Sequence, residues 1–350
     1  MYFVLYDRHL NSIGETYILE DWSRIQRAVD FDETRISGEQ IPYSADPFCV
    51  VINDRQGKQV FSGLASTPST DEKTRKTTIL LKDYMTLMNS DIVVDWGKLP
   101  KDLTLGNYIN HMLTLWLKQV DVGFVDIKWD VQRIQNLYWD SSIPLGEGNE
   151  SVQVYDLVHD CMSYYGLYCL PLLDVYHKTL TFVFYPTAVV KRSIRLKDFG
   201  IESIDKSYGD FNRVTVYDYK YNEVQRWAIT ENNAVVSLPS KEPLVYPAKS
   251  HNVIAETPED DLPYEQTLWD ATYDAVMSLS QNRYQVNIDL DVQKYASILD
   301  LSMLDFSYTI SVYTDEGLYQ DLPVGEIEQD SKGTHIIRLG YRIQELTQEI

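Results

Sequence analysis

The sequence predicts a β-rich α+β protein: two small antiparallel β-barrels, with an α+β domain inserted into the first and a helix-containing segment before the second. Three observations predict this class. Short apolar runs with period-2 alternation and turn residues between them fill residues 1–95 and return after residue 209. Helical spacing is concentrated between these parts and ahead of the last strands. Tyrosine occurs 26 times, against 10 Phe and 7 Trp, and it is typical of strands and half-exposed contacts.

The first part of the chain shows the strand pattern most clearly. Residues 53–57, Asn-Asp-Arg-Gln-Gly, tolerate positive φ and separate two apolar runs, which predicts a hairpin. A second turn is expected at residues 11–14, and residues 82–89 follow the last strand of this part. The strands expected here are residues 2–6, 16–19, 48–52, 59–64 and 77–81.

The strand pattern gives way to a different pattern near residue 96. Thr104 is expected to be the N-cap of a helix that ends near Lys118, because apolar residues recur there every three or four positions. Ser151 precedes a second helix, which Gly166 is expected to end. The strands expected after it are residues 167–173 and 179–185.

The strand pattern resumes after Gly209. A hairpin is expected at residues 213–219 and 224–230, and its β pattern resembles that of residues 1–95. This indicates that the hairpin completes the first barrel around the inserted unit. A loop rich in proline and acidic residues then leads into a helix that ends near Ser280 and has Pro263 in its first turn. The strands expected beyond it are residues 284–290, 307–313, 320–327 and 334–343.

These patterns divide the chain into three units, and 350 residues are enough for two or three cores. The first β-barrel takes residues 1–95 plus 206–238. The inserted α+β domain takes residues 96–205. The second β-barrel, with the preceding loop and helix, takes residues 239–350.

The charge balance argues against nucleic-acid binding. The chain has 31 Lys and Arg against 52 Asp and Glu, a formal charge of −21, whereas nucleic-acid binding requires clustered cations. The short basic runs at residues 73–76 and 191–192 are interpreted as turn and edge-strand charges. The start of the chain shows no secretory signal, and no stretch of about 18 apolar residues occurs, so we expect synthesis in a cytosol and no membrane insertion.

No catalytic residue is predicted, and the chain is expected not to be an enzyme. Two carboxylate pairs, Asp289 with Asp291 and Asp91 with Asp95, could be taken for the acid–base pair of a glycosidase. Residues i and i+2 of a strand share a face at roughly 6.5 to 7 Å, but no signal marks a sugar cleft between them. These carboxylates are therefore interpreted as solvated surface.

No cofactor or metal site is predicted either. The six histidines lack a metal-binding spacing, and His159 and Cys161 lie two apart on a helix, so they do not face each other. The glycines of residues 146–148 adjoin carboxylates that repel phosphate. The acidic run at residues 259–261 lacks calcium-loop spacing and is interpreted as a helix N-terminus, with Ca²⁺ binding as an alternative. The cysteines lack a Cys-x-x-Cys spacing and are expected to be free core residues: Cys49, Cys161 and Cys169.

Several segments together resemble a known family. Residues 59–64, Gln-Val-Phe-Ser-Gly-Leu, followed by residues 78–91, resemble the first β-barrel of phage tail hub proteins, where a strand pair leads into an Asp-containing turn and a short helix. Residues 210–217, Asp-Phe-Asn-Arg-Val-Thr-Val-Tyr, resemble the strand that returns to that barrel after an inserted domain. Residues 299–313 and 322–340 resemble the second hub barrel. The order of these segments is most similar to the tail-associated (Tal) hub proteins of lactococcal siphophage baseplates, which resemble contractile-phage hubs.

The resemblance implies a structural role in the virion. It implies a homotrimer whose six barrels form a pseudo-sixfold ring that docks on the hexameric distal tail protein. The ring would close the tail channel and open for ejection of DNA into the host, letting the DNA and the tape-measure protein pass without specific binding. Because the printed chain stops just after the second barrel, no lytic activity of longer relatives is carried over. The carboxylates could line the channel or the outer surface.

A different class of function also fits the composition. The surplus of tyrosine and tryptophan, with many carboxylates, is compatible with a carbohydrate-binding or cell-wall glycan-cleaving β protein. Tyrosines buried at subunit contacts explain the same count. Regulation by Ca²⁺ through the acidic loops is a third hypothesis.

Overall fold

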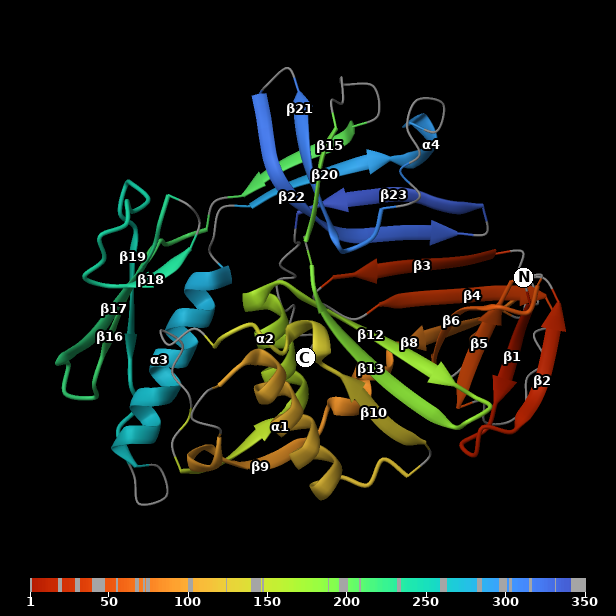
Figure 1. The fold of residues 1–350 in the computed structure, drawn as a ribbon, viewed down its shortest axis with the longest axis horizontal. Helices are drawn as coiled ribbons and strands as arrows, with labels where there is room; N and C mark the ends of the chain where they lie inside the picture. The colour runs from red at the N-terminus through yellow and green to blue at the C-terminus, as the bar shows by residue number, and fades with distance from the viewer. Residues whose placement is uncertain are drawn as a thin grey trace.

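The architecture comes from a computed structural model that describes most of the chain (Figure 1). The described residues are 2–17, 21–28, 32–39, 48–54, 56–66, 69–71, 73, 76–99, 103–123, 125–139, 146, 148–187, 189–194, 201–207, 209–231, 234–258, 263–281, 285–295, 301, 304–314, 317–330 and 332–340.

One large sheet runs through the molecule and contains strands from both ends of the chain (Figure 1). Its order is β15-β20-β23-β22-β3-β4-β8-β6-β5-β1-β2, and β7, β14 and β21 pair beside this path. The N-terminal strands are β1 (Tyr2–Tyr6), β2 (Ser12–Tyr17), β3 (Asp21–Arg27), β4 (Glu33–Glu39), β5 (Cys49–Asn53), β6 (Gln59–Ala65), β7 (Ser69–Asp71) and β8 (Lys76–Lys82). The later strands are β14 (Val190–Ile194), β15 (Ile201–Ser207), β20 (Gln285–Asp291), β21 (Tyr308–Thr314), β22 (Gly317–Asp330) and β23 (Gly333–Leu339).

Local turn chemistry sets the N-terminal hairpins. The turn after β5 forms as expected, with Gly57 at φ +83°. The first turn lies earlier than expected, because the Asp7 carboxylate accepts the backbone N–H groups of His9 at 2.8 Å and Asn11 at 2.9 Å. β2 therefore starts at Ser12, inside the segment expected to be the turn. After β8, Asp83 caps the short 3₁₀ helix η1 (Tyr84–Met88).

The α+β unit packs beside this sheet (Figure 1). Thr104 caps helix α1 (Leu105–Gln119) by accepting the Asn107 N–H at 3.2 Å, and Gly166, in the left-handed region, ends α2 (Val154–Tyr165), both as expected. Parallel and antiparallel pairing joins β10 (Asp126–Asp130), β13 (Thr179–Pro186) and β12 (Leu167–Asp174). The remaining elements are β9 (Asp91–Asp95), η2 (Trp96–Lys98), η3 (Gln132–Ile134) and β11 (Asn149–Gln153).

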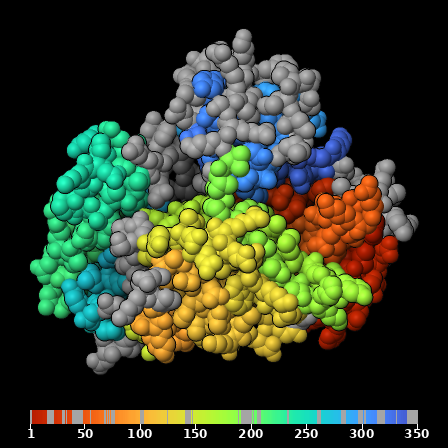
Figure 2. Space-filling model, viewed as in Figure 1, coloured from red at the N-terminus to blue at the C-terminus, as the bar shows by residue number. Residues whose placement is uncertain are grey.

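A smaller sheet stands apart on one side of the molecule, at the left of Figures 1 and 2. Its order is β18-β17-β16-β19, formed by β16 (Arg213–Tyr217), β17 (Glu223–Ile229), β18 (Val235–Ser237) and β19 (Ser250–Ile254). Helix α3 (Tyr264–Gln281) covers it and shares its core, with Ala275, Val276 and Leu279 fully buried. The helix α4 (Val292–Tyr295) follows β20.

The β-rich α+β class is confirmed, and in the described part of the chain the strands form open sheets. The division into three units stays a prediction, and the strand pairing differs from it in two places. The hairpin β16–β17 pairs with β18 and β19 rather than with β1–β8. Strands β14 and β15, expected in the inserted unit, pair with β21 and β20.

Candidate functional site

The pairing of β3 with β22 is where the two ends of the chain meet. The strands run antiparallel, and their register places Arg27 opposite Glu326 and Ser23 opposite Asp330. This pairing, called here the central seam, is the step in the strand order that joins the N-terminal strands to the C-terminal strands. The position of one β group relative to the other therefore depends on it.

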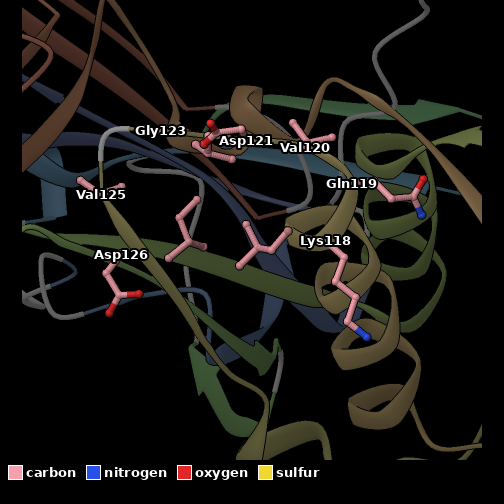
Figure 3. Close-up of a pocket in the computed structure, with 10 residues that line it drawn as sticks. Lys118, Gln119, Val120, Asp121, Gly123, Val125 and Asp126 are labelled. Atoms are coloured by element: carbon pink, nitrogen blue, oxygen red, sulfur yellow. The ribbon is translucent and has the colours of Figure 1, made fainter.

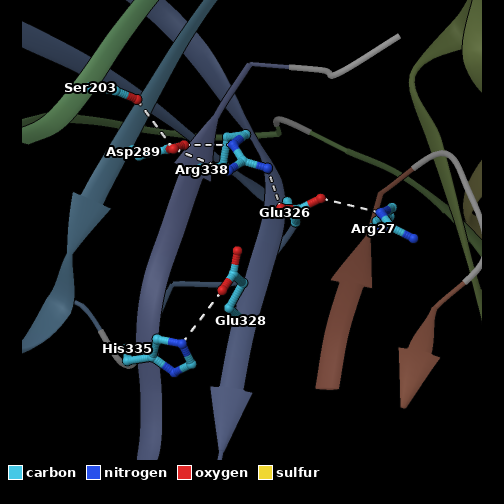
Figure 4. A network of polar contacts seen from close by, with 7 residues as sticks. All are labelled: Arg27, Ser203, Asp289, Glu326, Glu328, His335 and Arg338. Atoms are coloured by element: carbon cyan, nitrogen blue, oxygen red, sulfur yellow. Dashed lines mark hydrogen bonds and ion pairs between the residues drawn. The ribbon is translucent and has the colours of Figure 1, made fainter. Parts of the chain in front are cut away.

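A row of polar side chains crosses five strands at this seam (Figure 4). The row consists of directly opposed residues on β15, β20, β23, β22 and β3, and it is called the polar row: Ser203, Asp289, Arg338, Glu326 and Arg27. Opposed side chains on neighbouring strands are close enough to interact. Charge alternates in sign along the row, from Asp289 to Arg27, so the four charges sum to zero.

The contacts of the polar row are charge-assisted hydrogen bonds. Arg338 donates to Asp289 through Nε at 2.5 Å and Nη2 at 3.0 Å, and it also donates to Glu326. Glu326 is only 4% exposed and accepts from Arg27 Nε at 3.2 Å, while Ser203 Oγ donates to Asp289 at 3.2 Å. The hydrogen bonds that Arg338 donates to Asp289 raise the pKa of Arg338. A one-residue slip would turn these side chains to the other face, so the row specifies the register.

A second cluster of charges lies in the same region. Arg24, on β3, pairs with Asp32 at 2.6 Å, and its guanidinium lies 4.1 Å from the centre of the Phe61 ring. The Asp83 carboxylate accepts the Met85 N–H at 2.7 Å. Burial, followed by repulsion from Asp32, raises the pKa of the Asp83 carboxyl to about 7. These three charged groups are called the buried triad: Arg24, Asp32 and Asp83.

The sequence did not single out the polar row or Arg24. Asp289, interpreted as solvated, is held by Arg338, and Asp291 accepts the N–H groups of Gln293 and Lys294 at the start of α4. Simple alternation would place Glu326 on the same face as Val324, but the register shifts between these two residues. Val324 lies opposite Leu339 and Glu326 lies opposite Arg338, so the two side chains are on different faces of the sheet. Reading that position as a charge partner required the pairing with β3, which the sequence did not reveal.

Within the described residues, the other side chains considered from the sequence have separate contacts of their own. Asp95 pairs with Lys98 at 2.7 Å on the surface, and Asp91 lies four residues away on the same strand. His159 stacks on Tyr155, with ring centres 5.3 Å apart, while Cys161 is buried. The cysteines are free and buried as predicted, and burial raises the pKa of Cys49 to about 12.

The described residues contain no group of three or more His, Cys, Asp or Glu side chains arranged to hold a metal ion. None of the described helices has both the length and the apolar character needed to cross a bilayer.

The acidic run at residues 259–261 and residues 74–75 of the basic run lie outside the described residues. Glu150, beside the 146–148 glycines, accepts the Trp96 indole N–H at 2.7 Å.

A hollow of about 430 Å³ lies where α1 leads into β10 (Figure 3). Its lining is a continuous piece of chain, residues 117–123 and 125–127, and includes the charged residues Lys118, Asp121 and Asp126. These lining residues include no histidine, cysteine, serine or tyrosine, so they present no imidazole, thiol or hydroxyl group.

The surplus of tyrosine and tryptophan, with the many carboxylates, was the basis of the carbohydrate hypothesis. Among the tyrosines whose side chains the structure describes, the most exposed lie on four separate connections, after β10, β12, β16 and β18: Tyr138, Tyr176, Tyr221 and Tyr246. Tyr246 lies over the Arg213 guanidinium at 5.5 Å, so it has a contact within the protein. This distribution gives the carbohydrate hypothesis no specific support.

Comparison with known proteins finds similarity in structure. No family model matches the chain. No curated protein sequence matches it either. The prophage tail protein gp18 of Listeria monocytogenes EGD-e is similar in structure, with a TM-score of 0.51 and 13% identity over 98% of this chain and 95% of that chain. Tail proteins of Neisseria meningitidis MC58 (TM-score 0.46, 12% identity, 97% and 96% covered) and of prophage MuSo2 of Shewanella oneidensis (0.47, 11%, 98% and 98%) also align.

The first of these likenesses shows a shared fold over nearly the whole length of both chains. At 13% identity it shows the fold alone. The expectation that this chain folds like a phage tail protein is therefore confirmed, while its assignment to the Tal type rests on the sequence resemblance.

Replacing Glu326 tests the polar row. Glu326→Gln leaves Arg338 and Arg27 on either side of β22 without the carboxylate between them, so the free energy of unfolding should fall by roughly 3 kcal/mol. Urea unfolding followed by circular dichroism measures this change. The matched control is Glu223→Gln, whose pair with Arg226 is exposed and should cost about 0 to 1 kcal/mol. Equal stability of Glu326→Gln and wild type would contradict the role of the row.

The raised pKa of Asp83 predicts a pH dependence of stability. Between about pH 4 and pH 7 the folded protein binds more protons at Asp83 than the unfolded chain does, so this group makes stability fall as pH rises and then level off. In Asp83→Asn this decrease should be smaller by on the order of 2 to 4 kcal/mol. Urea midpoints measured across this pH range for both proteins give the difference. Parallel curves would show that Asp83 titrates as in an unfolded chain.

Proposed function

We propose that this chain is a structural protein of a phage tail, acting as the hub of its tip or baseplate. The observation that carries the proposal is the fold shared with a prophage tail protein over 98% of the chain. The order of the sequence segments that resemble the tail-associated hub proteins supports the finer assignment to a hub. In this role the protein belongs to the virion, is synthesised in the host cytoplasm and performs no covalent chemistry.

The hub would be a homotrimer. Each copy contributes two groups of β strands, and the central seam holds them in one fixed orientation. Three copies around a threefold axis present six such groups, a number that suits docking onto a hexameric distal tail protein. Because the two β groups of each copy keep a fixed orientation, the ring would open by movement between copies.

The charge of the chain suits a conduit for DNA. A formal charge of −21 repels phosphate, and this repulsion acts over roughly 8 Å at physiological salt. DNA and the tape-measure protein could then pass through a ring of such subunits without adhering to it. In this proposal the surplus of acidic residues prevents DNA from binding to the hub.

Measuring the oligomer tests the proposal. Multi-angle light scattering at micromolar concentration in physiological salt should give three times the chain mass of 40.6 kDa. The same sample mixed with the distal tail protein of the phage should elute as a larger complex. A monomer that also fails to bind this partner would refute the hub assignment.

A further inference from the structure

A cavity of about 250 Å³ lies between the N-terminal strands of the large sheet and β12 of the α+β unit. It is lined by the buried triad, by residues 59–62 of β6 and by residues 170–173 of β12. We call it the β6–β12 cavity. Among the described strands, pairing between β6 and β8 is limited to Leu64 and Ala65, so residues 59–62 of β6 pair there with β5 alone. The cavity therefore lies beside the partly unpaired edge of β6.

The buried triad gives the cavity an excess of negative charge. Arg24 is engaged by Asp32 on one side and by the Phe61 ring on its face. Asp83 has backbone partners, and within the described residues it forms no ion pair of its own. Two carboxylates thus face one guanidinium, and all three side chains are more than nine-tenths buried. The other titratable groups near Asp83, the buried side chains of Tyr84, Tyr168 and Cys169, are neutral.

The mouth of the cavity is apolar and open to solvent. Val60 is 38% exposed and Leu172 is 46% exposed, although both are aliphatic. Aliphatic walls around a charged floor suit a long cationic side chain, whose methylene groups pack on apolar surface while its head reaches a charge. The volume lies below the roughly 300 to 1,000 Å³ of small-molecule pockets, so it suits a single side chain.

We propose that the β6–β12 cavity receives a lysine or arginine side chain of a partner protein. The cationic head lies against Asp83, and the methylene stem packs between Val60 and Leu172. The charge of the triad with its guest is then zero. A buried carboxylate with a raised pKa requires either a proton or a cation, so the guest is favoured where Asp83 has lost its proton. The proposal rests on this geometry and does not depend on the tail assignment.

The lysine analogue n-butylammonium chloride provides a direct test. Saturation-transfer NMR on the intact protein at pH 8 should show saturable binding of the butyl group, weakening as pH falls below 7 because Asp83 takes up a proton. Asp83→Asn should lose the binding. Asp126→Asn, which changes a carboxylate that is 65% exposed in the other hollow, should keep it. n-Butanol serves as the uncharged control and should not saturate.

A second variant separates a lost guest from a disturbed fold. Leu172→Ser changes an exposed position, so the fold is retained, and it should weaken n-butylammonium binding several-fold by removing the apolar wall. Equal binding by wild type and Asp83→Asn, or equal binding of n-butanol, would overturn the proposal. Because the probe is a small cation, failure here leaves the oligomer measurement unaffected.

Discussion

The central seam is the constraint on which the rest of the structure depends. Five residue pairs of β3 and β22 connect strands separated by nearly 300 residues of chain. Without this pairing the N-terminal and C-terminal strands would be two sheets with free edges, joined through the α+β unit. With it, the path of the large sheet continues from β15 to β2, and the two β groups have one relative orientation.

Charge makes this constraint specific. Apolar cores lie on either side of the seam, with Ile36 and Ile79 in one and Ile327 and Ile337 in the other, and apolar contact alone tolerates sliding. The polar row does not tolerate sliding of one strand along the next, because each charge has its partner directly opposite. The buried triad adds a second fixed point on β3 through Arg24 and Asp32. In the proposed hub, a register fixed in this way would hold the two β groups of each copy in one orientation.

The sequence predicted local structure better than pairing. Thr104, Gly166 and the turn at Gly57 act through neighbours a few residues away, so their patterns could be interpreted directly. β3 and β4 escaped prediction, because polar residues in 21–27 and 33–39 interrupt the alternation that marks a strand. The polar row could not be predicted, because its members come from five strands and only tertiary pairing makes Arg27 and Glu326 neighbours.

Hydrogen exchange of the backbone amides in β3 and β22 tests the central seam most directly. If the seam joins the two β groups, the paired amides of residues 23–27 and 326–330 exchange slowly and at a common rate, since they open only with the sheet. Fast exchange in both strands, while β4 and β23 remain protected, would show two separate edges and contradict this account.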